Sequence, residues 1–205
     1  MKYYALWLVL ACIGVFILQL VFLPFTEIFL LKADVAAFQP WRFVTSIFLH
    51  GSFIHLLLNV FALAFFGLIL EKTIGSKPFI ILFFISGVLA SITAGFFYQK
   101  SLGASGAIFG IIGMLAVLRP MMTVWAFSLP MPLFVASILW AIADVLGVFF
   151  PSGTANMAHL SGLIVGVGAG LWFRTKQTYG ENRYTTKIAV PEHVLRKWEA
   201  LYLER

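Results

Sequence analysis

The stretch Gly-Ala-Ser-Gly-Ala-Ile-Phe-Gly-Ile-Ile-Gly-Met-Leu-Ala-Val-Leu-Arg-Pro, residues 103–120, places a serine at the start of a short apolar helix. From Ser105 to Leu118 the helix would be about 21 Å long, against about 30 Å for the hydrocarbon core of a bilayer. Arg119 and Pro120 fix one end at a membrane surface, so Ser105 should lie about 9 Å below the other surface. Non-helical backbone is tolerated at that depth only inside protein or beside water. The sequence therefore predicts a wet pocket with a serine at a helix N-terminus.

The composition is typical of a polytopic membrane protein. Of its 205 residues, 61% are hydrophobic and 11% are charged, whereas a soluble domain carries about 25% charged residues. The mean hydropathy is +0.99. We expect an all-α polytopic membrane protein with six transmembrane helices, the helix of Ser105 being the fourth. The six apolar segments are 3–23, 53–70, 78–97, 105–118, 124–149 and 158–173.

The positions of the charges predict the orientation. Six spans put both ends of the chain on one side, and most Lys and Arg residues lie in the segments on that side, among them Lys72, Lys77 and Arg119. The positive-inside rule therefore predicts a multi-pass protein of the cell membrane with both termini in the cytoplasm. The net charge of +6 includes no basic stripe interleaved with aromatic residues, so we expect no nucleic-acid partner.

The chain is expected to divide into a membrane domain over 1–175 and a cytoplasmic tail over 176–205. Apolar residues at helical spacing in the tail predict a short amphipathic helix on the inner membrane surface, with docking of a partner protein as the alternative. These residues are Val194, Leu195, Trp198, Leu201 and Tyr202. The single cysteine, Cys12, excludes an intrachain disulfide framework.

A histidine opens the sixth segment. This segment runs from outside to inside, so His159 shares a leaflet with Ser105. Small residues at regular spacing line both helices and allow their backbones to approach closely. They are Gly106, Gly110 and Gly113 on the fourth segment, and Gly162, Gly166 and Gly170 on the sixth. Close packing of the two helices would bring His159 towards Ser105, and such polar residues inside a membrane point to a functional site.

The second segment adds two polar side chains. His55 and Asn59 are four residues apart and share one helix face. With Ser52 as the N-cap, both residues lie in the outer half of the membrane. Their N–H groups suit an oxyanion hole, whereas His50, in the loop before the helix, is interpreted as a structural residue.

Each of these features has a structural alternative when it is taken singly. Gly-x-Ser-Gly occurs as a packing motif, and a buried histidine or an His/Asn pair can join helices through hydrogen bonds. The hydrolytic interpretation is favoured because the polar groups coincide at similar depth in one leaflet. Asp144, in the outer half of the fifth segment, fits either a third triad member that orients His159 or a packing or hydration residue, and the second interpretation is favoured.

The chain resembles the rhomboid intramembrane serine proteases of the six-helix core type over residues 1–175. Five motifs in matching order carry the resemblance: Trp41-Arg42, the series His50, His55 and Asn59, Glu71-Lys72-x-x-Gly75-Ser76, Gly103-x-Ser105-Gly106, and Ala158-His159-x-x-Gly162-x-x-x-Gly166.

The resemblance implies a role for each of five residues. Ser105 would be the nucleophile and His159 the general base, acting as a dyad. His55, Asn59 and the Ser105 backbone N–H would hold the oxyanion, and Gly103 would let the substrate backbone approach. The chain departs from some family members at one position, where Phe109 replaces a tyrosine beneath the catalytic histidine.

The fifth segment carries two prolines near its start, Pro130 and Pro132, which predict a bend or a late start of the helix. By analogy with the family, this helix borders the route by which a substrate helix arrives from lipid.

The resulting expectation is a serine endopeptidase that cleaves single-span membrane proteins near the outer end of their transmembrane helix. With no Cys/His cluster and no phosphate-binding loop in the sequence, neither a metal nor another cofactor is expected. The first rival is a non-catalytic rhomboid-like protein that binds membrane helices for quality control, although such relatives typically lack the serine or the histidine. A transporter or channel ranks last, because the inner halves of the spans are almost wholly apolar.

Overall fold

The computed structural model describes residues 2–150, 153–184 and 192–202. Within them, four helices are long and apolar enough to cross a membrane: α1 (Tyr4–Val21), α4 (Phe53–Ile74), α5 (Ser76–Phe97) and the first part, Asn156–Thr175, of α8 (Asn156–Tyr184). Two shorter apolar helices, α6 (Ser105–Leu118) and α7 (Leu133–Phe149), complete the expected set. The predicted all-α polytopic membrane fold is confirmed.

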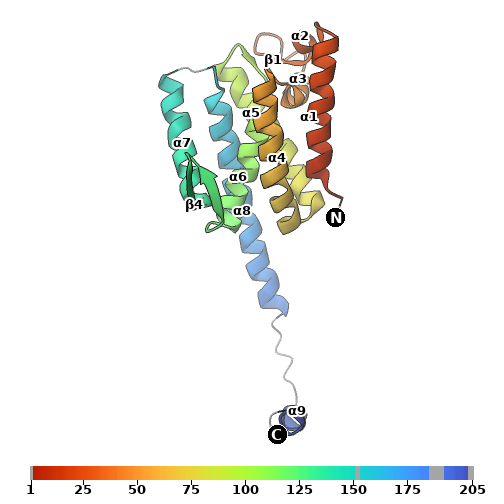
Figure 1. Ribbon diagram of the computed structural model, residues 1–205, viewed down its shortest axis with the longest axis vertical. Coiled ribbons are helices and arrows are strands. Elements are labelled where there is room, and N and C mark those ends of the chain that lie inside the picture. The colour runs from red at the N-terminus through yellow and green to blue at the C-terminus, as the bar shows by residue number, and fades with distance from the viewer. Residues whose placement is uncertain (1, 151–152, 185–191, 203–205) are drawn as a thin grey trace. The chain divides into compact units, whose positions relative to one another are not determined.

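The short helix α6 lies in the middle of the bundle, between α4 and α7 and against α5 (Figure 1). It begins at Ser105 and ends at Leu118, as the sequence predicted. Most of its side chains are buried, including Ile111 and Leu115. A helix that is apolar all round belongs in such a core position, so Ser105 stands at the end of the most enclosed helix in the bundle.

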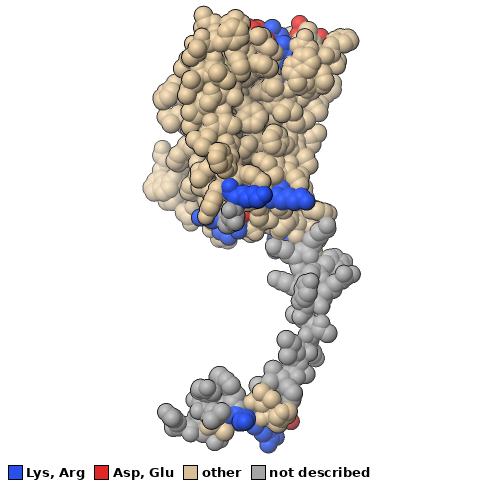
Figure 2. All heavy atoms as spheres, turned by 90° about the vertical axis from the view of Figure 1, so that its right-hand side faces the viewer, with Lys and Arg blue, Asp and Glu red and all other residues tan. Residues whose placement is uncertain are grey.

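The charged residues lie mainly outside the membrane-spanning part of the helices. On the face of the helix bundle shown in Figure 2, the Lys, Arg, Asp and Glu side chains gather near its two ends, and the broad band between them shows none. That distribution is the one expected of a chain whose middle faces lipid. Two observations therefore support a multi-pass membrane protein: the long apolar helices and the uncharged band on the surface.

The fifth helix begins later than position 124. Residues before it form an antiparallel hairpin, β3 (Thr123–Ala126) and β4 (Leu129–Pro132), whose last pair is Ala126 with Leu129. Phe127 and Ser128 both have positive φ, at 52° and 64°, which is the backbone of a two-residue hairpin turn with the twist of its strands. The boundary predicted at 124 is wrong, whereas the late start indicated by the prolines is correct.

The connection from α1 to α4 is an ordered loop with short elements: α2 (Phe25–Phe29), β1 (Leu31–Lys32), α3 (Arg42–Thr45) and the 3₁₀ turn η1 (Ser46–Phe48). The buried Arg42 fixes this loop, because its Nη1 donates to the carbonyl oxygens of Glu27 at 3.1 Å and Leu30 at 2.6 Å. A guanidinium supplies several donors in a rigid fork, which suits it to gathering carbonyls.

The same loop is joined to the segment that precedes Ser105. Strand β1 pairs with β2 (Lys100–Ser101), and Leu31 lies opposite Ser101. Glu27 accepts hydrogen bonds from Lys32 and Lys100, at 2.8 Å and 3.0 Å, and these two bonds lower the pKa of its carboxyl. The loop that carries Gly103 is therefore held from the side by the first loop.

At the other end of the bundle, Glu71 attaches α1 to α4. Its carboxylate is fully buried and accepts hydrogen bonds from the backbone N–H groups of Tyr4 and Ala5, each at 3.0 Å, and from the hydroxyl of Ser76. The first N–H groups of a helix have no partner within the helix. A side chain on α4 thus caps α1.

Residues 1–171 form one compact unit and residues 172–205 a second. The second contains α9 (Glu192–Tyr202). Several side chains of the predicted amphipathic face, those of Leu195, Trp198, Leu201 and Tyr202, lie outside the described set. The predicted division at 175 and the amphipathic character of the tail stay predictions.

Candidate active site

The first two predicted site residues are in direct contact. Ser105 Oγ lies 2.8 Å from His159 Nε2, although the two residues are far apart in the sequence. Ser105 begins α6 and His159 lies in the first turn of α8. A serine hydroxyl that donates to an imidazole nitrogen is the basic unit of an activated nucleophile.

The glycines on α6 and α8 make this contact possible. A Cβ atom on Gly162 would overlap the carbonyl oxygen of Gly106, and one on Gly166 would overlap that of Gly110. A Cβ on Gly113 would lie 2.5 Å from the carbonyl oxygen of Leu163. The close packing predicted from the small-residue spacing is confirmed, and it sets the distance between the serine and the histidine.

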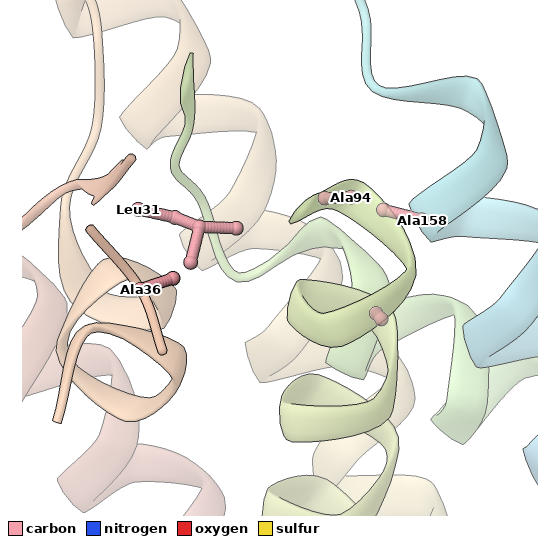
Figure 3. Close-up of a cluster of buried hydrophobic side chains, with 5 residues drawn as sticks. Leu31, Ala36, Ala94 and Ala158 are labelled. Carbon is pink, nitrogen blue, oxygen red and sulfur yellow. The ribbon is translucent and has the colours of Figure 1, made fainter. Parts of the chain in front are cut away.

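The start of α8 is fixed by its own contacts. Leu31 and Ala36 of the first loop, Ala90 and Ala94 of α5, and Ala158 of α8 form one buried cluster, in which Ala94 and Ala158 lie close together (Figure 3). The backbone N–H of Met157 donates to the Tyr98 hydroxyl at 3.1 Å. These contacts involve the two residues directly before His159 and fix the backbone that leads to it.

The imidazole of His159 has two further neighbours. The ring of Phe109 stacks on it, with centroids 4.4 Å apart and planes within 7° of parallel. The carboxylate of Asp144, on α7, lies 3.0 Å from Nδ1, through Oδ1. The sequence favours a packing or hydration role for Asp144, whereas in the structure its carboxylate is in hydrogen-bond contact with His159.

His55 carries a ring N–H on the side of Gly103, next to the serine. The backbone N–H of Gly51 donates to His55 Nδ1 at 3.4 Å, which leaves the ring proton on Nε2. A Cβ on Gly103 would lie 2.9 Å from this Nε2 and 3.9 Å from Ser105 Oγ. The missing side chain of Gly103 therefore opens the space in which His55 Nε2 and Ser105 Oγ face one another.

Asn59 lies one turn below His55 on α4 and is buried. Its Nδ2 donates to the carbonyl oxygen of His55 at 2.8 Å. An amide nitrogen carries two hydrogens, so one N–H stays available for another acceptor. Asn59 lines the same cavity as Ser105 and His159.

His50 has the structural role expected of it. Its backbone exchanges two hydrogen bonds with the side chain of Gln19 on α1, and its Nδ1 is 3.2 Å from the carbonyl oxygen of Phe48. Burial lowers the pKa of His50 to about 4, so its ring is neutral at pH 7. The ring packs edge-on against His55 and so supports the orientation of that residue.

A large cavity leads from the site along the helices. Its volume is about 1510 Å³, and it is bordered by α4, α6, α7 and the start of α8. Polar residues Ser105, His55, Asn59 and His159 lie in it together with apolar ones. The apolar lining includes Ile54, Leu58, Phe61, Phe65, Trp125 and Trp140. The cavity therefore combines a polar centre with a largely apolar groove along α4.

Comparison with known proteins gives a consistent result. Residues 37–176 match the family model of the Rhomboid domain. The chain is 33% identical over 162 residues to "RHOMBOID-like protein 6, mitochondrial" of Arabidopsis thaliana, which covers 73% of this chain and 52% of that protein. It is 33% identical over 138 residues to "Rhomboid protease GlpG" of Yersinia pseudotuberculosis serotype I (strain IP32953), which covers 65% and 48%. The chain thus spans about half the length of these two curated relatives.

Proposed function

The chain belongs to the rhomboid family, and from that premise we propose that it is an intramembrane serine endopeptidase that cleaves single-span membrane proteins near the outer end of their transmembrane helix. The observation that carries the proposal is the contact of 2.8 Å between Ser105 Oγ and His159 Nε2 inside a bundle of apolar helices. A relative of similar sequence is named a rhomboid protease.

The proposed reaction is acyl transfer in two steps. Ser105 Oγ attacks the scissile carbonyl carbon as His159 Nε2 accepts the hydroxyl proton, which forms a tetrahedral intermediate. His159 then gives this proton to the leaving amine as the C–N bond breaks. In the second step His159 takes a proton from water, the hydroxide attacks the acyl-enzyme, and Ser105 is released with its proton restored.

The negative oxygen of the intermediate needs donors aimed at it. We assign this function to His55 Nε2–H, the free N–H of Asn59 and the backbone N–H of Ser105. The last donor stands at the N-terminus of α6, where the helix dipole also favours negative charge. Gly103 allows the substrate backbone to approach these groups.

The apolar groove of the cavity is consistent with a helical substrate that enters from lipid. It lies along α4 and reaches Trp140 of α7, and its apolar lining suits a transmembrane segment with a diameter of about 10 Å. The proposed partners are therefore single-span membrane proteins and the surrounding bilayer. Both termini are proposed to face the cytoplasm of a cell membrane, with the active site near the outer surface.

The first experiment measures cleavage of a single-span substrate in liposomes by the parent protein, Ser105→Ala and His159→Ala. The parent should cut, and each variant should lose at least about 10³-fold in rate, because the nucleophile and its base act as a unit. Thr73→Ala is the matched control, since the Thr73 hydroxyl bonds only to the carbonyl oxygen of Ile69 on its own helix among the contacts described.

Labelling with a fluorophosphonate tests the serine without a substrate. The parent should become labelled at Ser105, and both Ser105→Ala and His159→Ala should not. A parent protein that neither cuts several substrates nor accepts the label would contradict the proposal and favour the non-catalytic helix binder.

A further inference from the structure

Asp144 is a buried acid in an apolar helix. Its side chain is 8% exposed, and Oδ2 has no hydrogen-bond partner among the described residues. On the same helix, Val145 and Leu146 are both exposed and apolar. Burying a carboxylate costs free energy that an apolar residue of similar size would avoid. Packing alone therefore does not account for an acid at this position.

The one polar contact described for this carboxylate is with His159. Oδ1 lies 3.0 Å from Nδ1, while Nε2 on the other side of the ring contacts Ser105 Oγ. A carboxylate can only accept here, so Nδ1 carries the ring proton and Nε2 keeps a lone pair for the serine hydroxyl. The acid thus selects the tautomer that general-base catalysis requires.

Phe109 cannot make this selection. Its ring stacks on the imidazole at 4.4 Å and restrains the tilt of the ring. A phenyl face offers the same contact to both tautomers and donates no hydrogen bond. Among the described neighbours of His159, Asp144 is the group that distinguishes Nδ1 from Nε2.

The backbone brings Asp144 within reach through a close contact between α7 and α8. A Cβ on Gly147 would lie 2.5 Å from Asn156 Nδ2. Asn156 begins α8, three residues before His159, and Gly147 lies three residues after Asp144. The absence of a side chain at Gly147 therefore allows the two helix ends to meet where the carboxylate reaches the imidazole.

We propose that Asp144 is a positioning residue that holds His159 in its Nδ1–H tautomer through the carboxylate contact and so makes Ser105, His159 and Asp144 a triad. The proposal rests on the proposed protease function. Asp144 takes up no proton during the reaction. It accepts the Nδ1–H hydrogen bond and stabilises the imidazolium that forms when Nε2 receives the serine proton.

The test compares three variants at this position in the full-length protein: Asp144→Asn, Asp144→Leu and Asp144→Glu. Asp144→Asn and Asp144→Leu should lower kcat by roughly 10²–10⁴-fold with little change in KM, because the groove is intact and only the base is misoriented. The rate of fluorophosphonate labelling should fall in parallel. Asp144→Glu keeps a carboxylate and should recover part of the loss.

Thermal unfolding separates positioning from packing. Asp144→Leu should keep or raise the Tm while activity falls, since it replaces an incompletely paired buried carboxylate with an apolar group. A residue needed only for packing would lose stability and activity together. Ser137→Ala is the matched control on α7, because this buried hydroxyl donates to the carbonyl oxygen of Leu133 on its own helix.

Nitrogen-15 spectra of the histidine rings supply a third readout. The His159 signal, identified by its absence from His159→Asn, should show the proton on Nδ1 in the parent and a loss of this preference in Asp144→Asn. Unchanged kcat in Asp144→Asn with an active parent overturns this proposal alone. An inert, unlabelled parent overturns the proposed function as well.

Discussion

At the residue scale, Gly103 is a position where a missing side chain shapes the site. Its φ of +122° lies in a region that L side chains rarely adopt, and a Cβ would lie 2.8 Å from His55 Cε1. Its N–H donates to the carbonyl oxygen of Ser46 at 2.9 Å, which fixes the loop. Any side chain would therefore press on His55.

We predict that Gly103→Ala lowers kcat/KM by about 10²-fold or more, the effect of removing one oxyanion donor. Gly95→Ala is the control, because a Cβ there would lie 3.9 Å from Phe43 Cε1, an ordinary contact. The test compares the cleavage rates of Gly103→Ala and Gly95→Ala at equal amounts of folded protein. Full activity in Gly103→Ala would show that His55 does not need the open space beside it.

Single residues also show how far sequence reasoning reaches. Ser105 and His159 could be predicted because each stands in a short motif with glycines at fixed spacing. The role of Asp144 stays open between triad member and packing residue, because no short motif surrounds this residue to indicate which helix its carboxylate faces. Its contact with His159 depends on how α7 meets α8, which involves Gly147 and Asn156 and follows no local pattern.

At the element scale, the packing of α6 on α8 sets the geometry of the site. Gly110 and Gly166 face each other so closely that a Cβ on Gly166 would overlap the Gly110 carbonyl oxygen. Backbone cannot yield as a flexible side chain does. Any added atom must therefore separate the two helices and carry His159 away from Ser105.

We predict that Gly166→Ala lowers the free energy of unfolding by about 1–3 kcal/mol, the usual cost of overpacking, and also lowers activity. Gly168→Ala, two positions further along α8, should be neutral or stabilise the protein by about 0.5–1 kcal/mol, because nothing lies within 4 Å of its Cβ position and alanine favours a helix. Thermal unfolding and cleavage assays of the two variants test the pair. Equal effects of both substitutions would contradict the packing argument.

The apolar helices were predictable as elements, and the small strands were not. Long apolar runs fix α1, α4 and α5 because a membrane span needs about 20 such residues. The β1–β2 pair joins two distant loops by only two residue pairs, which leaves no pattern in either loop. The β3–β4 hairpin could not be predicted, because its apolar residues continue without a break into α7. Only the two prolines indicated that the helix begins after them.

At the scale of the whole molecule, one buried charged side chain joins the first helix to α4, and another fixes the first loop internally. Glu71 caps α1 from α4, and Arg42 gathers the carbonyls of the first loop. Both act on backbone groups that have no partner in their own helix or strand. Strand β1 of this loop pairs with β2, and this pairing fixes the segment that leads to Ser105. The segment before Ser105 is thus held by the first loop, while Glu71 fixes α1 at the other end of the bundle.

The orientation of the bundle decides where the proposed reaction takes place. We predict that the variant Lys100→Cys, in the loop that precedes Ser105, reacts with a membrane-impermeant maleimide in intact cells. The variants Lys77→Cys and Arg119→Cys should react only after the membrane is permeabilised, because the positive-inside rule predicts that these positions face the cytoplasm. All three residues are exposed, whereas the native Cys12 is buried and should give little background. The reverse pattern would place Ser105 near the cytoplasmic surface, so that any substrate would be cut at the inner end of its helix.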